Sequence, residues 1–438
     1  MLLRADRTDG IPRWRAPSDA PHRPWRLRPS ATPAADRAST RAFRAVAWLA
    51  GEAGGEHIPR FSYEVASLLG PGTGVPCPPD ALGQSPIVTS RLSLLAGPDA
   101  LRILRERGLR AEDVAVVPAA SGGPKWIALH GIDRFLAGFL AGRSRPLHLV
   151  GSSIGAWRMA ALAQRDPLAA MARFREAYLG QRFPPRPPPG LVSRVSEGVL
   201  DAMLGATGAE EILSHPWVRL HVITARARGL LASERPVVQG LGLALAASAN
   251  ALSRRTLGLS LERVVFHSAG DDTPFSGWRD LPTRHLPLDA GNLRAALLAS
   301  GSIPLALSGV TFPGGPEGVF RDGGLVDYHL DLPFPAGDGL VLYPHFYPHV
   351  VPGWFDKAIR WRRAPASRLS RTLVIAPSPG FVARLPGRSI PDRQDFHRLP
   401  DEERLRAWRA ALAESEAMGE ELGELVSTGR IAERVRPL

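Results

Sequence analysis

The sequence predicts an α/β fold with a largely parallel β-sheet. From Leu101 onward, short apolar segments alternate with longer segments whose apolar residues recur at helical spacing. This alternation is typical of strands joined by crossover helices, which place neighbouring strands in parallel. A composition of 44% hydrophobic and 22% charged residues is ordinary for a globular protein, and 438 residues suffice for a large core.

The expected strands are short runs rich in branched and aromatic side chains, and the helices fall between them. These strands are Val114–Val117, Leu147–Val150, Leu220–Thr224, Val264–His267, Val319–Arg321, Leu340–Tyr343 and Thr372–Ala376.

Three regions differ in texture. Residues 1–95 are low-complexity, Arg- and Pro-rich and lack sustained periodicity, so we expect them to be largely disordered. Residues 96–380 carry the α/β pattern. Residues 381–438 are expected to form a C-terminal helical extension, in which Asp401–Leu425 is a solvated, peripheral amphipathic helix.

Composition limits the classes of partner. The net charge of +12 favours anionic partners, although the charge is spread along the chain and no nucleic-acid module is recognisable, so no nucleic acid is expected. Of the 54 basic residues, only Lys125 and Lys357 are lysines.

No secretory signal or transmembrane run is evident, which predicts a cytoplasmic protein and leaves peripheral contact with an anionic membrane open. The single cysteine, Cys77, excludes an intrachain disulfide and a cysteine-based metal site. The histidines are scattered, so neither a metal nor a cofactor is expected.

A candidate nucleophile follows the strand Leu147–Val150. The pentapeptide Gly-Ser-Ser-Ile-Gly at 151–155 leads directly into a helical apolar run. Gly-x-Ser-x-Gly between a strand and a helix is typical of a nucleophile elbow, a sharp turn that exposes the serine. Larger side chains at Gly151 and Gly155 would clash in such a turn. Ser153 is therefore the candidate nucleophile, and an ordinary strand-to-helix turn is the alternative.

A glycine-rich loop follows the strand Val114–Val117. It reads Ala-Ala-Ser-Gly-Gly-Pro-Lys at 119–125 and precedes a helical run. Backbone N–H groups in such a loop can bind a phosphate or the oxyanion of an acyl-transfer intermediate. The loop lacks the P-loop pattern, which argues against an NTPase. Because proline has no N–H, the candidate donors are Gly122 and Gly123, with Ile154 as a third.

A candidate acid or base comes much later in the chain. Asp322 ends the strand Val319–Arg321 and precedes Gly323 and Gly324, which allow a sharp turn beside another group. A carboxylate there could take a proton from Ser153. A simple Asp-Gly-Gly turn would explain the same residues.

Together these pieces resemble the patatin-like phospholipase family of lipid acyl hydrolases. That family has a glycine-rich oxyanion loop, then a Gly-x-Ser-x-Gly elbow, then a distant Asp-Gly-Gly or Asp-Gly-Ala. Here 121–125, 151–155 and 322–324 occur in that order, and Ala-Ser-Gly-Ser-Ile-Pro at 299–304 is similar to the stretch before the family's aspartate. The resemblance covers roughly 110–350 and implies a three-layer fold with a Ser153–Asp322 dyad.

The oxyanion loop departs from the family pattern. The family's loop is usually Asp-Gly-Gly-Gly-x-Arg-Gly, whereas Ala120, Ser121 and Trp126 replace the Asp, the first Gly and the last Gly. Lys125 keeps the positive charge of the family's arginine. It could pin the loop as a structural cation or meet a lipid phosphate.

The resemblance implies a lipid acyl hydrolase that cleaves carboxylic esters through an acyl-enzyme, with a lipid or ester as substrate. Two alternatives stay open. One is a Ser-His-Asp esterase, which needs a histidine after the acid. The other is a non-catalytic membrane- or protein-binding module on a degraded hydrolase fold. The histidines that could serve the first are His329, His345, His349 and His397.

Two further segments allow more than one interpretation. Leu241–Arg255 is either a buried core helix or a lid over the site. Trp354–Arg363 mixes aromatic and cationic residues, as an interfacial helix or a half-buried surface helix does.

Overall fold

The computed structural model describes residues 90–268 and 273–438. Most of the predicted disordered region 1–95 and Cys77 therefore lie outside the described residues. The end of that region is ordered, because Leu92–Ala96 forms strand β1.

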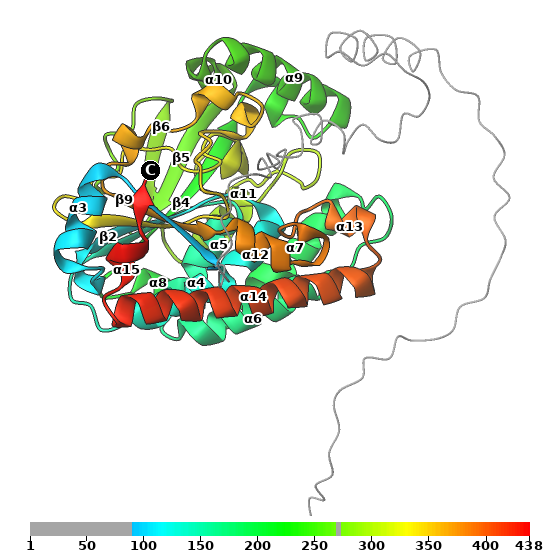
Figure 1. Cartoon of the computed structure of the whole chain (residues 1–438). Coiled ribbons are helices and arrows are strands. Elements are labelled where there is room, and N and C mark those ends of the chain that lie inside the picture. Colours follow the sequence, from blue (N-terminus) through cyan, green and yellow to red (C-terminus); the bar gives the residue numbers. More distant parts are fainter. Residues whose placement is uncertain (1–89, 269–272) are drawn as a thin grey trace, which may run out of the picture. The chain divides into compact units, whose positions relative to one another are not determined.

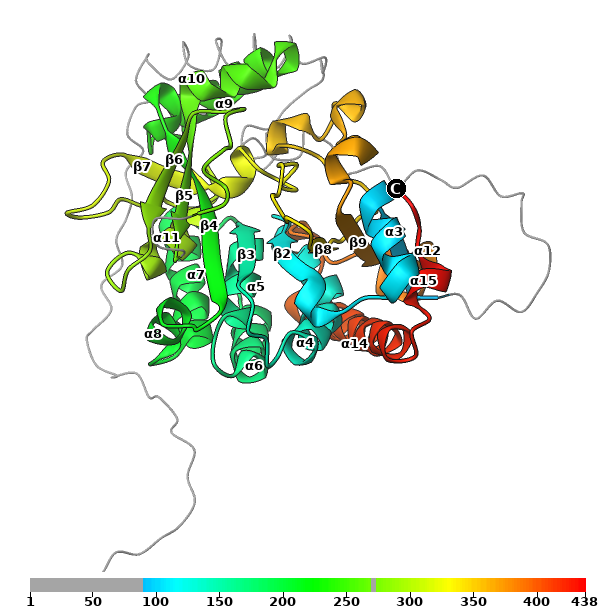
Figure 2. The ribbon, with the colours of Figure 1, turned by 90° about the vertical axis from the view of Figure 1, so that its left-hand side faces the viewer.

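A mixed, mostly parallel sheet of ten strands forms the centre of the fold (Figures 1 and 2). The strand order is β10-β1-β9-β8-β2-β3-β4-β5-β6, and β7 pairs with β4 off this path. Antiparallel pairs are β1 with β9, β4 with β5 and β4 with β7. The strands are β1 (Leu92–Ala96), β2 (Val114–Ala119), β3 (Leu147–Ser152), β4 (Val218–Ala227), β5 (Leu261–His267), β6 (Thr283–Pro287), β7 (Val319–Asp322), β8 (Leu340–Pro344), β9 (Thr372–Pro377) and β10 (Arg436–Pro437).

Helices cover both faces of the sheet, which confirms an α/β fold and agrees with the predicted layers (Figure 2). The α-helices are α3 (Pro98–Arg107), α4 (His130–Phe139), α5 (Ile154–Leu162), α6 (Pro167–Leu179), α7 (Pro189–Leu204), α8 (Gly208–Leu213), α9 (Pro236–Leu252), α10 (Leu257–Ser260), α11 (Leu293–Ser300), α12 (Pro379–Arg384), α13 (Asp395–Arg398), α14 (Asp401–Ser427) and α15 (Ile431–Arg434).

Side chains that alternate between the two faces of the central strands divide the core into two clusters. Val117 and Leu149 belong to a cluster that includes side chains of α4, α5, α6 and α14. Their chain neighbours Val116 and Val150 belong to a second cluster with residues of α9 and α10. Because successive side chains of a strand point to opposite faces, apolar runs are needed where both faces are covered. This explains why the central strands are apolar throughout.

Every predicted strand is confirmed, with ends that differ by a few residues. The strands not predicted lie toward the edges of the sheet. In β6 no side chain is fully buried, and the segment contains Arg284, His285 and Pro287, so it lacks an apolar run. Strand β10 has only two residues and pairs in parallel with β1.

The C-terminal region is helical as predicted but is not peripheral. One face of α14 is buried in the main core through residues such as Trp408, Leu412 and Met418. The other face carries the charged residues that suggested a solvated helix. An amphipathic pattern shows that a helix has an apolar face, and here that face packs on α4 (Figure 1).

Two other segments differ from their expected form. The segment Leu241–Arg255 is not a wholly buried core helix, because α9 buries Leu243 and Ala246 and exposes Leu241 and Leu245. The segment Trp354–Arg363 forms short 3₁₀ turns, η7 (Trp354–Asp356) and η8 (Arg360–Arg362), instead of one helix. Within the described ranges, no helix has the length and apolar character needed to cross a membrane.

Helices α4 and α14 touch at their backbones. A Cβ added to Gly131 would collide with the Ser415 carbonyl, and one added to Gly419 would collide with the Gly131 carbonyl. The Gly131 N–H also donates to Ser415 Oγ at 2.8 Å. Only glycine allows this approach, so these two positions fix where α14 lies against the fold.

We predict that Gly419→Ala lowers the free energy of unfolding by about 1–3 kcal/mol, because the added methyl group forces the helices apart. Gly423→Ala, four residues along α14, is the matched control. Its Cβ would meet the Phe135 ring at an ordinary 3.5 Å, so we expect it to stabilise by up to about 1 kcal/mol through helix propensity. Denaturant unfolding of both variants checks this, and equal effects would contradict the proposed crossing constraint.

Candidate active site

Ser153 sits in a strained turn between β3 and α5. Its backbone has φ 55° and ψ −130°, which L-residues with a side chain rarely adopt. A Cβ at Gly151 would collide with the backbone of Ala156, and one at Gly155 would collide with the carbonyl of Ala119 at the end of β2. The two glycines are therefore required for the reason that the sequence suggested. The geometry is that of a nucleophile elbow.

Ser300 supports this turn from α11. The Ser153 N–H donates to Ser300 Oγ at 2.8 Å, and Ser300 Oγ donates to the Ile223 carbonyl in β4 at 2.6 Å. Ser300 is fully buried. It thus satisfies a backbone donor of the strained serine and ties α11 to the sheet beside it.

The register of three strands carries Asp322 to the serine. Strands β3 and β4 are parallel, and the last residue of β3, Ser152, pairs with Ile223. Strand β4 continues to Ala227, and β7 pairs antiparallel with this extension, with Asp322 opposite Thr224. The carboxyl end of β7 therefore points back to the carboxyl end of β3. Two residues that are 169 positions apart in sequence meet there.

Ser153 Oγ donates to Asp322 Oδ2 at 2.7 Å, and Asp322 Oδ1 accepts the Gly324 N–H at 2.7 Å. Both side chains belong to buried residues, each 6% exposed. Burial raises the pKa of Asp322 to about 6, against the opposing effects of these two hydrogen bonds and of Arg393 and Lys357. A carboxylate with this pKa is a stronger base than an exposed aspartate.

The turn after Asp322 also requires glycine. A Cβ at Gly323 would collide with the Ile223 carbonyl, and one at Gly324 would lie 2.6 Å from Ser121 Oγ. Beyond the turn, the buried Asp327 forms a bidentate ion pair with the buried Arg263 of β5, at 2.6 and 2.8 Å. This pair anchors the turn to the sheet.

The glycine-rich loop faces the same point. Ser121 donates its N–H to the Tyr328 carbonyl at 2.9 Å and its hydroxyl to Ser152 Oγ at 2.9 Å. Gly122 packs so closely on the Phe346 ring that a Cβ would lie 2.7 Å from it, and Gly123 has φ 54°. In the described part of the chain, the N–H groups of Gly122, Gly123 and Ile154 have no acceptor. They remain available for an oxyanion.

Trp126, which departs from the family's glycine, is a core residue. Its ring stacks on Phe174 with centroids 4.6 Å apart and meets Tyr178 edge-on at 5.4 Å. It begins the packing of the helical turn η3 (Gly123–Leu129) on α6. Trp126 therefore belongs to the core behind the loop and leaves the unpaired backbone N–H groups of the loop in place.

Lys125 is paired. Its ammonium contacts the carboxylate of Asp392, which lies just before α13. Burial, together with Arg393, lowers the pKa of Lys125 to about 8, although Asp395 acts in the opposite direction. This pairing favours the pinning role for Lys125 over direct contact with a lipid phosphate.

The histidines considered for a Ser-His-Asp site make other contacts. His329 Nδ1 accepts the Val351 N–H at 3.0 Å, and His345 Nδ1 accepts the Tyr347 N–H at 2.9 Å. His349 stacks on Tyr347, and His397 is an exposed residue of α13. The hydrogen bond of Ser153 runs directly to Asp322, without an intervening imidazole.

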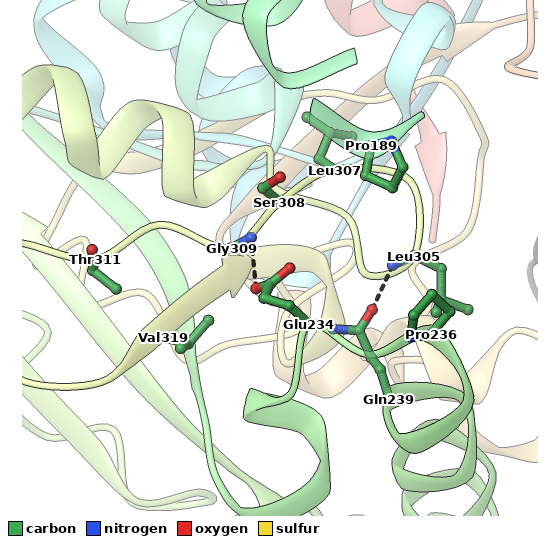
Figure 3. A pocket seen from close by; sticks show the side chains of 10 residues that line it. All are labelled: Pro189, Glu234, Pro236, Gln239, Leu305, Leu307, Ser308, Gly309, Thr311 and Val319. Atoms are coloured by element: carbon green, nitrogen blue, oxygen red, sulfur yellow. Dashed lines mark hydrogen bonds between the residues drawn. The ribbon is translucent and has the colours of Figure 1, made fainter. Parts of the chain in front are cut away.

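A cavity of about 430 Å³ lies between α9, the start of α7 and the segment 305–311. Figure 3 shows Glu234 and Gln239 reaching this segment, where they accept the N–H groups of Gly309 at 3.1 Å and Leu305 at 2.6 Å. None of the candidate site residues lines the cavity. Within residues 90–268 and 273–438, no group of His, Cys, Asp or Glu side chains could hold a metal ion.

Sequence reasoning did not assign roles to Ser300, Arg263, Asp327 or Arg393. The stretch around Ser300 was noted for its resemblance, but its contact with Ser153 depends on the packing of α11. Arg263 and Arg393 are arginines in a chain full of arginines, so nothing in the sequence marks them. Lys357 was marked by the rarity of lysine and by its place in the aromatic and cationic segment Trp354–Arg363, but neither feature assigned it to the site.

The sequence matches no protein-family model and no curated protein sequence.

We predict that Asp322→Asn makes the folded protein more stable at pH 7.5. The pKa of Asp322 is raised to about 6 on folding, so its ionisation destabilises the folded state as pH rises from about 4 to 6. The asparagine has no such penalty, and its advantage at pH 7.5 should be up to about 3 kcal/mol. Denaturant unfolding at pH 7.5 and pH 4 measures it.

At pH 4 the advantage should nearly vanish. The exposed Asp338 is the control, and Asp338→Asn should show no comparable change between the two pH values. An Asp322→Asn variant that is less stable at pH 7.5, or equally changed at both pH values, would refute the linkage.

Proposed function

We propose that the protein is a patatin-like acyl hydrolase with a three-layer fold that cleaves carboxylic esters of lipids through Ser153 and Asp322. The observation that carries this proposal is the 2.7 Å hydrogen bond from Ser153 Oγ, in a strained strand-to-helix turn, to a buried aspartate. The available N–H groups of Gly122, Gly123 and Ile154 support the same reaction. The resemblance of the same motifs to the patatin-like family is consistent with this proposal.

In the first half-reaction, Asp322 takes the proton of Ser153 as Oγ forms a bond to the ester carbonyl carbon. The carbonyl electron pair moves to its oxygen, and that oxyanion accepts hydrogen bonds from Gly122, Gly123 and Ile154. When the intermediate collapses, the bond to the alcohol oxygen breaks and the alcohol leaves with the proton from Asp322. An acyl-enzyme on Ser153 remains.

In the second half-reaction, water attacks the acyl carbonyl and gives its proton to Asp322. The second oxyanion uses the same donors. When this second tetrahedral intermediate collapses, the bond between the acyl carbon and Ser153 Oγ breaks. Oγ takes the proton from Asp322, and the carboxylic acid is released. Helix α5 begins at Ile154, immediately after Ser153. The dipole of this helix favours negative charge on Ser153 Oγ.

Exposed apolar side chains support a lipid as substrate. In the described part of the chain, most of the large exposed apolar residues lie on α9, on α10 and in the turn that precedes α9. They are Leu230, Val237, Leu241, Leu245, Leu252 and Leu259. Such a concentrated apolar surface is unusual on a monomeric protein and suits contact with lipid. The exposed Arg235 and Arg255 flank α9 and suit an anionic lipid surface.

We expect a fluorophosphonate probe to label the wild-type protein and to leave Ser153→Ala unlabelled, because the probe reacts with an activated serine hydroxyl. Ester turnover should fall by at least about 1,000-fold in Ser153→Ala and Asp322→Ala. Labelling and hydrolysis of p-nitrophenyl esters measure these effects. Ser193→Ala, on α7, is a control for loss of a serine hydroxyl elsewhere. A wild type with neither labelling nor turnover would favour the binding-module alternative.

We also expect kcat/KM to rise with pH through about 6, because only ionised Asp322 can accept the serine proton and its pKa is raised to about 6. Below that pH, the rate should fall tenfold for each pH unit. A pH profile with a neutral ester measures this. A profile that is flat between pH 5 and 8 would show that Asp322 is not the base.

A further inference from the structure

Both lysines of the chain lie at the candidate active site. Lys125 follows the oxyanion loop, and Lys357 follows η7, more than 200 residues later. Each alters the pKa of a group in the site: Lys357 acts on Asp322, and Lys125 acts on Lys357. All other basic residues of the chain are arginines, and both lysines lie near the Ser153–Asp322 pair.

The two lysines differ in their partners. Lys125 contacts the carboxylate of Asp392, which neutralises it. The ammonium of the half-buried Lys357 lies 4.2 Å from the centroid of the Tyr328 ring and 5.6 Å from that of Trp354. No carboxylate among the described residues pairs with Lys357. Aromatic rings attract a cation but do not neutralise it, so Lys357 has no ion-pair partner in the described part of the chain.

Arg393 is a second cation without an ion-pair partner among the described residues. Its guanidinium nitrogens lie 3.9 and 4.0 Å from the position that a Cβ on Gly123 would occupy. Arg393 is half-buried and forms no ion pair with any described residue. The nearby carboxylates are engaged: Asp392 contacts Lys125, and Asp395 accepts Trp408 Nε1 at 2.8 Å and the Asp392 N–H at 2.9 Å.

The two cations face the oxyanion loop from different segments. Arg393 lies against Gly123. Lys357 lies over the ring of Tyr328, and the backbone carbonyl of Tyr328 accepts the Ser121 N–H. Burial, and then repulsion from Lys125 and Arg393, holds the pKa of Lys357 well below its usual range, although attraction to Asp322 acts in the opposite direction. Half-buried cations that repel one another are costly unless an anion joins them.

We infer that Lys357 and Arg393 form a binding site for an anionic group of the substrate, a phosphate or a carboxylate, beside Gly123. The inference rests on the proposed function and narrows it: the hydrolase prefers esters that carry an anion close to the scissile carbonyl. Arg393 offers a planar fork for two oxygens of the anion, and Lys357 supplies a compact charge.

Three short esters with one acyl group test the preference: monobutyrylglycerol, monobutyryl glycerate and monobutyrylglycerol phosphate. They differ in carrying no anion, a carboxylate or a phosphate. We expect kcat/KM of the wild type to be about tenfold or more higher for at least one anionic ester than for the neutral ester. Comparison of the two anionic esters shows which anion the site prefers. Inorganic phosphate should inhibit competitively.

Lys357→Met and Arg393→Gln should each lower the ratio of kcat/KM for the preferred anionic ester to that for the neutral ester by roughly tenfold. Arg105→Gln, on the exposed face of α3, removes the same charge elsewhere and should leave the ratio unchanged. Because Lys357 also lowers the pKa of Asp322, its removal can alter both rates. A ratio measured at one pH cancels that effect and isolates anion binding.

Hydrolysis of all three esters at equal kcat/KM, or an unchanged ratio in both variants, would overturn the inference and leave the proposed function standing. No hydrolysis of any ester, together with an unlabelled wild type, would overturn both. Thermal unfolding of each variant identifies one that has lost its fold, and the wild-type preference and phosphate inhibition test the inference without any variant.

Discussion

The site depends on a difference in strand length, because β4 is longer than its neighbour β3. Strand β3 ends at Ser152, opposite Ile223, whereas β4 runs on to Ala227. The bare edge of that extension accepts β7 in the antiparallel direction. If β4 ended level with β3, β7 would have no partner at this edge and Asp322 would not reach Ser153. The backbone hydrogen bonds of the sheet therefore set the distance between the two side chains.

Holding these groups together has an energetic cost, which the surrounding contacts offset. Ser153 has a rare backbone conformation, and Asp322 is a buried carboxyl that is harder to ionise than an exposed one. The Ser300 hydroxyl on one side and the Arg263–Asp327 ion pair on the other fix the two turns that carry them. Such local strain and buried charge are typical of functional sites, where the fold overrules the preference of individual residues.

The sequence predicts the centre of this molecule better than its edges. Central strands are buried on both faces and so form apolar runs, whereas β6 is partly exposed and β10 depends on β1 for its existence. The sequence shows the apolar face of α14 but does not show that this face packs on α4. That contact depends on glycines, which carry no periodic signal. In the site, motifs marked Ser153, Asp322 and the loop glycines. Arg393 and Asp327 were invisible, because their positions arise only when distant segments pack together.

The proposed catalytic residues and the two cations of the proposed anion site belong to different parts of the architecture. Asp322 ends β7 and Ser153 directly follows the end of β3, where a change of backbone would disturb the whole core. Lys357 and Arg393 lie in irregular segments between β8 and β9 and before α13, which pair with no strand. Irregular segments tolerate substitution, insertion and deletion far better than central strands do. If the proposed reaction is correct, selectivity in such an arrangement can diverge during evolution, or be redesigned in the laboratory, without a change in the proposed catalytic residues.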